Sequence, residues 1–218
     1  MQIVIPIYDR FTALDAVGPY EVLSRLPDAE VVFAALEAGP VTTETDMLTL
    51  IADEPLEALP APDVIVVPGG FGTRVLLDDE RMVGWLRSAH ETSQWTTSVC
   101  TGSLLLGAAG ILDGLDATTH WMELERLTEF GARPTSRRVV EQGKVITAAG
   151  VSSGIDMALT LVARIAGDVF AQGIQLSIEY DPEPPFDTGS TEKAGPELTE
   201  LVRAAATGLL KEGERAEA

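Results

Sequence analysis

A single cysteine occupies a position suited to a nucleophile. Cys100 follows a β-branched run, residues 96–99, and precedes Thr101-Gly102-Ser103, which opens an apolar stretch with helical spacing. This predicted strand-to-helix turn resembles a nucleophile elbow, although Val99 replaces the glycine that usually precedes the nucleophile. The helix N-terminus would stabilise a thiolate, and the amide of Thr101 could face an anion on a bound substrate. From position alone, a buried structural cysteine is an equally good interpretation, because free cysteine is among the most buried residue types.

A carboxyl group and a glycine-rich turn are candidates for the same site. Asp15 opens a helical stretch, residues 14–26, and is predicted to be its N-cap, with Pro19 tolerated in the first turn. Alternatively, Asp15 is an acid/base group whose pKa is raised by a neighbouring thiolate in a semi-apolar pocket. The turn Pro68-Gly69-Gly70-Phe71-Gly72 follows an apolar run and makes Gly70 N–H a candidate oxyanion donor. Taken alone, that turn is more simply an ordinary tight turn.

Aromatic and apolar residues near predicted strand ends could line a substrate pocket. The candidates are Phe71, Trp121 and Val151, although such residues more often belong to the core. His120 is placed at the end of a short strand. It could pair with Cys100 or be a hydrogen-bonded structural histidine, and its spacing from Cys100 leaves both interpretations open.

The elements that must position these residues alternate along the chain. The β-branched runs cover residues 3–5, 31–33, 64–67, 96–99 and 145–147, and the helical stretches cover residues 14–26, 80–91, 101–109 and 155–165. Near-continuous apolar strands that alternate with helices predict an α/β fold: a flavodoxin-like, doubly wound, mostly parallel sheet in a three-layer αβα sandwich. Ligands of such sheets bind beyond the carboxyl ends of the strands, so the candidate residues would share one edge.

Composition narrows the classes of function. The 218 residues are 45% hydrophobic, which supports a substantial core, and no apolar run is long enough for a membrane span. A net charge of -19 disfavours nucleic-acid binding. One cysteine and two histidines exclude an intrachain disulfide and are a poor supply of metal ligands. We therefore expect a cytoplasmic protein that acts on a small-molecule substrate, with no metal, no nucleic-acid partner and no membrane partner.

Two parts of the chain differ in character. Residues 1–180 are expected to form the α/β domain, and residues 181–218 a C-terminal arm and helix packed on that domain. The segment Asp181-Pro182-Glu183-Pro184-Pro185-Phe186 breaks helix and strand alike, and residues 197–210 return to helical spacing.

Several segments together resemble the ThiJ/PfpI superfamily, across about residues 1–180. They are Leu14-Asp15-Ala16-Val17-Gly18-Pro19-Tyr20-Glu21, Val67-Pro68-Gly69-Gly70-Phe71-Gly72, Val99-Cys100-Thr101-Gly102-Ser103, Ala117-Thr118-Thr119-His120-Trp121 and residues 149–156. Within the superfamily the chain is most similar to the isonitrile hydratases. Asp15 stands where many relatives have glutamate, and Thr101 follows the nucleophile where PfpI-type peptidases have histidine.

This resemblance implies a hydro-lyase that converts an isonitrile and water to an N-substituted formamide. It implies Cys100 as nucleophile, Asp15 as acid/base, Gly70 and Thr101 as orienting groups, no cofactor, and a homodimer. Two alternatives remain: a glyoxalase- or deglycase-like enzyme, and a non-enzymatic redox sensor in which Cys100 oxidises. The sensor half of some AraC-type regulators is also similar. A DNA-binding regulator is disfavoured because few residues follow Phe186 and the chain is acidic.

Overall fold

The computed structural model describes the backbone of residues 1–216 and the side chains of residues 1–206. The chain divides into two compact units, Met1–Glu179 and Tyr180–Ala218. The first contains the large sheet. The second consists of an irregular segment followed by α7 (Thr191–Ala216), which is interrupted at Gly195. The expected packing of residues 181–218 on the first unit stays a prediction, and the last two of these residues lie outside the described part.

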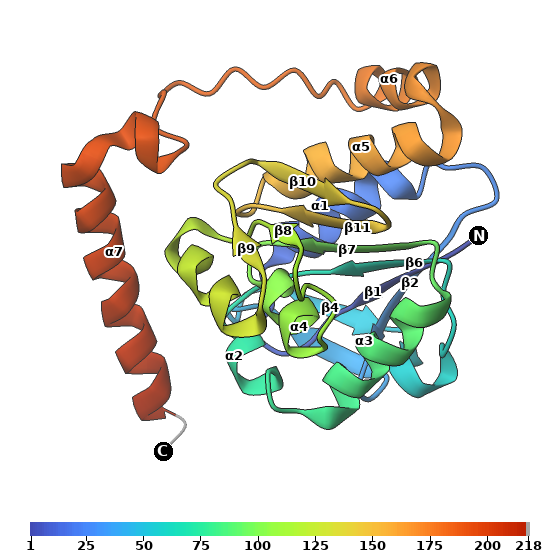
Figure 1. The fold of residues 1–218 in the computed structure, drawn as a ribbon, viewed down its shortest axis with the longest axis horizontal. Coiled ribbons are helices and arrows are strands. Elements are labelled where there is room, and N and C mark those ends of the chain that lie inside the picture. The colour runs from blue at the N-terminus through green and yellow to red at the C-terminus, as the bar shows by residue number, and fades with distance from the viewer. Residues whose placement is uncertain (217–218) are drawn as a thin grey trace. The chain divides into compact units, whose positions relative to one another are not determined.

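The first unit is built on a seven-stranded sheet in the order β10-β11-β7-β6-β1-β2-β5 (Figure 1). Its strands are β1 (Gln2–Pro6), β2 (Glu30–Ala35), β5 (Glu54–Pro55), β6 (Val64–Val67), β7 (Trp95–Val99), β10 (Val139–Gln142) and β11 (Val145–Ala148). All neighbouring pairs are parallel except β10 and β11. If β1, β2, β6, β7 and β11 are counted as first to fifth, their spatial order is 2-1-3-4-5, the flavodoxin-like order. The predicted fold class is therefore confirmed.

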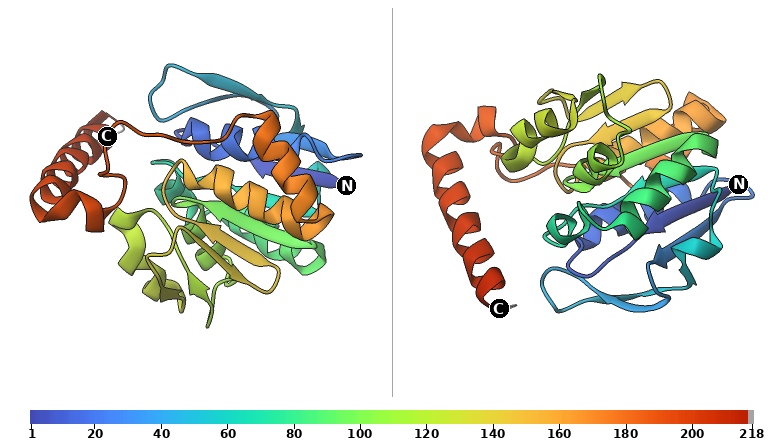
Figure 2. Two further views of the ribbon diagram at one scale, coloured as in Figure 1. Left: turned by 90° about the horizontal axis from the view of Figure 1, so that it is seen from above. Right: turned by 60° about the horizontal axis from the view of Figure 1, so that its bottom comes forward.

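Helices cover both faces of this sheet (Figures 1 and 2). The helices α1 (Ala13–Leu23) and α5 (Ser153–Ala166) lie on one face, and α3 (Glu80–Thr92) and α4 (Gly102–Ala108) lie on the other. The short α2 (Thr73–Leu76) follows β6, and α6 (Asp168–Ser177) packs against α5. The sequence of α3 shows why it forms. Asp79 caps its first amides, and Met82, Leu86 and Ala89 place one buried stripe against the sheet.

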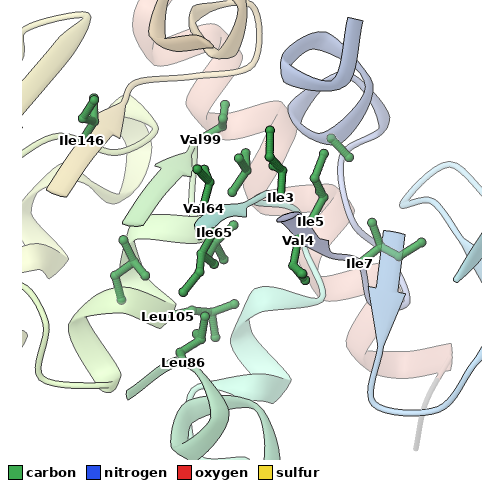
Figure 3. Packing of buried hydrophobic residues seen from close by; sticks show 14 of the residues in the cluster. Ile3, Val4, Ile5, Ile7, Val64, Ile65, Leu86, Val99, Leu105 and Ile146 are labelled. Carbon is green, nitrogen blue, oxygen red and sulfur yellow. The ribbon is translucent and has the colours of Figure 1, made fainter. Parts of the chain in front are cut away.

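The core lies on both sides of the central strands, which explains their continuous apolar runs. Every residue of β6 is buried. In Figure 3, Val4 and Ile65 point toward Leu86 and Leu105 of α3 and α4, whereas Ile3 points to the opposite side. A strand whose two faces are both covered has no polar face, so its sequence does not alternate.

Short elements complete the first unit. They are the hairpin β3 (Gly39–Thr42) and β4 (Thr49–Ala52), the pair β8 (Asp116–Ala117) and β9 (Arg133–Pro134), and the 3-10 segments η1 (Leu56–Ala58) and η2 (Trp121–Phe130). The strand predicted to end at His120 ends at Ala117 instead, and His120 caps η2. Among the helices of the described residues, none combines the length and the apolar character that crossing a membrane requires.

Candidate active site

Three loops meet at the carboxyl edge of the sheet, where the strand order reverses. The loops follow β1, β6 and β7, which are neighbours. The loop after β1 leads into α1, which carries Asp15, and the other two loops carry Gly69-Gly70 and Cys100. The chain leaves β1 for β2 on one side and returns to β6 on the other. This switch point is where open α/β sheets bind ligands.

The backbone at Cys100 is held in a strained conformation. Its φ is 54°, in the left-handed region, which costs a non-glycine residue roughly 1–3 kcal/mol. Its N–H donates to the carbonyls of Ala148 and Ala149, and its own carbonyl accepts from Thr119 Oγ1 at 2.8 Å and Ser103 Oγ at 3.2 Å. These four hydrogen bonds fix the turn from β7 into α4. The thiol is consequently held at the sheet edge, with the residue only 5% exposed.

Asp15 is fully buried beside this turn. Its Oδ2 accepts the N–H of Gly69 at 2.9 Å, and its Oδ1 has no hydrogen-bond partner in the described part of the chain. The N-cap prediction for Asp15 is wrong, because α1 begins at Ala13 with Thr12 as N-cap, and Pro19 lies inside the helix. The carboxyl therefore reaches away from its own helix to the loop after β6.

Burial dominates the acid–base properties of both groups. It raises the pKa of Asp15 to about 8, against the hydrogen bond from Gly69 and with a further rise from the charge of Glu44. Burial also raises the pKa of the Cys100 thiol, the charge of Asp15 adds to this, and the Thr101 amide opposes it. The direction for Asp15 is the one expected from sequence. For Cys100 the sequence had predicted a thiolate stabilised by the N-terminus of the following helix, but the pKa of the thiol is raised instead. That helix, α4, has only seven residues, and its dipole does not outweigh desolvation.

The glycine loop is fitted closely around the same turn. A Cβ on Gly69 would lie 2.5 Å from the backbone nitrogen of Thr101, so only glycine allows this approach. Gly70 N–H donates to Thr101 Oγ1 at 2.9 Å. It is therefore not the free oxyanion donor that the sequence suggested, and it instead ties the loop to Thr101. The amide of Thr101 does lie next to the Cys100 sulfur.

The predicted pocket residues lie in the segments that follow β6, β8 and β11. The guanidinium groups of Arg10 and Arg74 lie 5.8 and 5.7 Å from the ring centroid of Phe71, which is half-buried. The rings of Trp121 and His120 are 5.7 Å apart. Val151 lies in the turn between β11 and α5. That Phe71, Trp121, Val151 and His120 contact a substrate stays a prediction.

His120 has a structural place that the sequence left open. Its Nδ1 accepts the N–H of Met122 at 3.4 Å, and a Cβ on Gly150 would lie 2.7 Å from its Cδ2. Burial lowers the pKa of the imidazole, which favours its neutral form. Within the described residues no hydrogen bond joins His120 to Cys100. The hydrogen-bonded structural interpretation is thus favoured over a Cys–His pair. No group of three potential metal ligands is found in the described part of the chain.

Three polar residues of the site carry no sequence signal. The Thr73 hydroxyl contacts that of Thr101, and the Tyr8 hydroxyl contacts that of Thr73. Tyr8 lies in the loop after β1 and Thr73 in the four-residue α2, so neither belongs to a periodic pattern. Glu44 follows β3, where its N–H donates to the Phe11 carbonyl, and its charge raises the pKa of Asp15 and of Cys100. The β-bridge between Phe11 and Thr43 brings this segment to the site.

The fold and the site define an α/β protein with a buried cysteine and a buried carboxyl at the switch point of the sheet. The profile of the DJ-1/PfpI family matches residues 1–164, and the chain belongs to this family. An isonitrile hydratase from Pseudomonas putida is 43% identical over 211 residues, which cover 97% of this chain and 92% of that protein.

Further relatives show how widely the fold is used. The crystal structure of a ThiJ/PfpI family protein from Pseudomonas syringae matches with a TM-score of 0.89 and 36% identity, over 97% of this chain and 86% of that one. The HTH-type transcriptional regulator CdhR from Pseudomonas aeruginosa is 29% identical over 182 residues. This chain covers 53% of the regulator's length, so the likeness concerns only part of that protein.

Proposed function

We propose that the protein is an isonitrile hydratase, which adds water to R–N≡C to give the N-substituted formamide. The observation that carries the proposal is the buried pair of Cys100 and Asp15, in which the carboxyl has a raised pKa and one oxygen without a partner among the described residues. Such a carboxyl can keep a proton at neutral pH and deliver it to a substrate. The 43% identity to a protein named isonitrile hydratase, across almost the whole chain, supports this activity over others.

The first half of the reaction forms a thioimidate. Burial raises the pKa of both groups, so the resting pair holds both protons at neutral pH. The reactive form is the one that has lost the thiol proton to solvent and keeps the proton on Asp15. The sulfur bonds to the terminal carbon of the isonitrile while Asp15 gives its proton to that same carbon. The product is R–N=CH–S–Cys100, and Asp15 is left as a carboxylate. Covalent catalysis divides one difficult hydration into two easier steps.

The second half releases the formamide. Asp15 takes a proton from water as the hydroxyl adds to the thioimidate carbon, and this proton passes to nitrogen. The tetrahedral intermediate then loses its hydroxyl proton to Asp15 as the C–S bond breaks. The products are R–NH–CHO, the Cys100 thiolate and protonated Asp15, which restores the starting state. The unpartnered Oδ1 of Asp15 is the atom that we assign to the water.

The remaining assignments of the proposal follow from position. The Thr101 amide stabilises charge on sulfur, Gly70 holds Thr101, and the R group contacts Phe71, His120, Trp121 and Val151. The scheme needs no metal or organic cofactor. We also propose that the protein is a homodimer in the cytoplasm, and sedimentation velocity tests the dimer.

The decisive experiment measures formamide production from cyclohexyl isocyanide by the wild type, Cys100→Ala and Asp15→Asn. We expect no detectable turnover by Cys100→Ala and a loss of about 10²–10⁴-fold in kcat for Asp15→Asn. Methylglyoxal is assayed in parallel, and the intact mass is recorded after mild peroxide treatment. A wild type that is inactive on a panel of isocyanides contradicts the proposal. Turnover of methylglyoxal, or a stable sulfinate on Cys100, would then identify the carbonyl enzyme or the redox sensor.

A further inference from the structure

One buried peptide group connects Tyr8 to Asp15. It is the peptide between Pro68 and Gly69, just after β6. Its carbonyl oxygen accepts the Tyr8 hydroxyl at 2.7 Å, and its N–H donates to Asp15 Oδ2 at 2.9 Å. Tyr8 is 6% exposed and Asp15 is fully buried. The two side chains therefore bind the two polar groups of a single peptide.

The donor and the acceptor of each hydrogen bond follow from the chemistry of the groups. A carbonyl oxygen has no proton, so Tyr8 must donate to Pro68. Burial raises the pKa of the Tyr8 phenol, so the hydroxyl keeps its proton at neutral pH. With that proton used, Tyr8 accepts from Thr73 Oγ1 at 3.0 Å. Hydrogen bonds in a chain polarise one another, so the bond to the carbonyl strengthens the Gly69 N–H as a donor to Asp15.

The covalent chain leaves the orientation of this peptide open. Turning it over changes ψ of Pro68 and φ of Gly69, and glycine populates both signs of φ readily. The next peptide, by contrast, is held at both ends by other groups. The Gly69 carbonyl accepts the N–H of Thr12 at 2.8 Å, and Gly70 N–H donates to Thr101 Oγ1 at 2.9 Å. The orientation of the Pro68–Gly69 peptide therefore depends on its side-chain partners.

We propose that Tyr8 is a positioning residue for Asp15, which fixes the Pro68–Gly69 peptide so that its N–H, and not its carbonyl, faces the carboxyl group. An N–H can only donate, which favours the carboxylate form of Asp15. A carbonyl can only accept, which would favour the protonated form. Without the Tyr8 hydroxyl, the protonated acid can bind a turned carbonyl, and an unturned N–H is a weaker donor. Both effects hold the proton on Asp15 more tightly.

The test is the titration of Asp15, followed by the NMR signal of its carboxyl carbon from pH 5 to pH 10. Asp15→Asn identifies the signal. In the wild type we expect a midpoint at the pKa of about 8. Tyr8→Phe should raise the midpoint by about 1 unit, which is a ~10-fold smaller ionised fraction below it. Cys100 and Glu44 are the other titratable groups that face Asp15, and the substitution alters neither.

Thr97→Val is the matched control. Thr97 is also buried, and its hydroxyl donates at 2.9 Å to a backbone carbonyl of β6, that of Ile65. Asp15 accepts its backbone hydrogen bond from Gly69 instead, so its midpoint should stay at the wild-type value in Thr97→Val. An unchanged or lowered midpoint in Tyr8→Phe overturns the proposal. An equal shift in Thr97→Val also overturns it, because any buried defect would then suffice.

Replacing tyrosine by 3-fluorotyrosine tests the same bond without removing the hydroxyl. The fluorine makes the phenol a stronger donor, so the midpoint of Asp15 should fall, and a rise contradicts the proposal. The inference rests on the proposed function only for its consequence in turnover, because the titrations are informative even in a protein that is inactive on every isocyanide. If the protein is a hydratase, Tyr8→Phe should in addition lower kcat more than it changes KM, because Asp15 then gives up its proton less readily.

Discussion

Cys100 and Asp15 are two acids in one pocket, and burial disfavours the charged form of each. Hydrogen bonds from Gly69 and from the thiol itself oppose this effect at the carboxyl. Glu44 adds a negative charge nearby and makes ionisation harder for both groups. Both groups are therefore protonated at rest near neutral pH, and it is the proton of Asp15 that the proposed reaction moves between carbon, water and nitrogen. A histidine is not required for this, and His120 is occupied in capping η2.

The raised pKa of Asp15 predicts how stability depends on pH. The folded pKa is about 8 and the ordinary value is 3.8, so between these values the folded state binds the proton that the unfolded state has lost. The free energy of unfolding therefore falls through this range, by at most roughly 1.4 kcal/mol per pH unit. An asparagine side chain cannot ionise, so the Asp15→Asn variant does not lose this part of the free energy of unfolding. Urea unfolding should show Asp15→Asn close to the wild type near pH 4 and increasingly more stable up to pH 8.

Comparing the stability with and without Asp15→Asn in a Cys100→Ala background shows whether burial or the thiol raises the pKa of Asp15. Burial is the largest contribution to the Asp15 shift, so the dependence on pH should persist without the thiol. A stability difference between Asp15→Asn and wild type that does not change from pH 4 to pH 8 would contradict the raised pKa.

Among the elements, α4 owes its place to close contact with the loop after β6. A Cβ on Gly102 would lie 2.2 Å from the carbonyl oxygen of Val67 and 2.7 Å from that of Pro68. Both contacts are with backbone, which cannot rotate away. The start of α4, and with it the Cys100 turn, is thus fixed against the end of β6. Gly84 in α3 is different, since the nearest atom to its Cβ would be Glu80 Oε2 at 3.9 Å.

These two helical glycines give a matched prediction. Gly102→Ala should lower the free energy of unfolding by about 2 kcal/mol or more, because the helix must shift to relieve the overlap. Gly84→Ala should raise it by roughly 0.5–1 kcal/mol, the usual gain from replacing glycine by alanine inside a helix. Thermal or urea unfolding of both variants checks the two signs. A stabilised Gly102→Ala would show that α4 is not held against β6.

The sequence predicted the sheet, the four main helices and the loops of the site, but not the contacts within it. Strands such as β6 are apolar on both faces, and α3 has an amphipathic period, so both leave a local pattern. The bond from Gly69 to Asp15 joins residues 54 apart, and that from Gly70 to Thr101 joins residues 31 apart. No local pattern records such pairs. The N-cap prediction for Asp15 was wrong because its carboxyl accepts the distant amide of Gly69 instead of an amide of its own helix.

At the scale of the whole molecule, negative charge greatly exceeds positive charge. The chain has 34 acidic and 15 basic residues, for a net charge of -19. Several basic side chains form surface ion pairs, such as Arg164 with Glu141 and Arg81 with Glu37, but most carboxylates have no basic residue to match. A folded chain brings these like charges closer together than an unfolded chain does, and this repulsion destabilises the compact state.

Salt should therefore stabilise the protein at neutral pH. The Debye length shortens from about 30 Å at 0.01 M to about 10 Å at 0.1 M salt, so repulsion between distant carboxylates is largely screened. A gain of about 1 kcal/mol corresponds to a rise in Tm of roughly 2–4 °C for a chain of this size. We expect that rise between 0.01 M and 0.2 M for both NaCl and KCl, which excludes binding of one particular cation. Near the isoelectric point of about 4.3 the positive and negative charges balance, and the rise should disappear. A Tm that falls with salt at pH 7 would mean that the surface ion pairs outweigh the net repulsion.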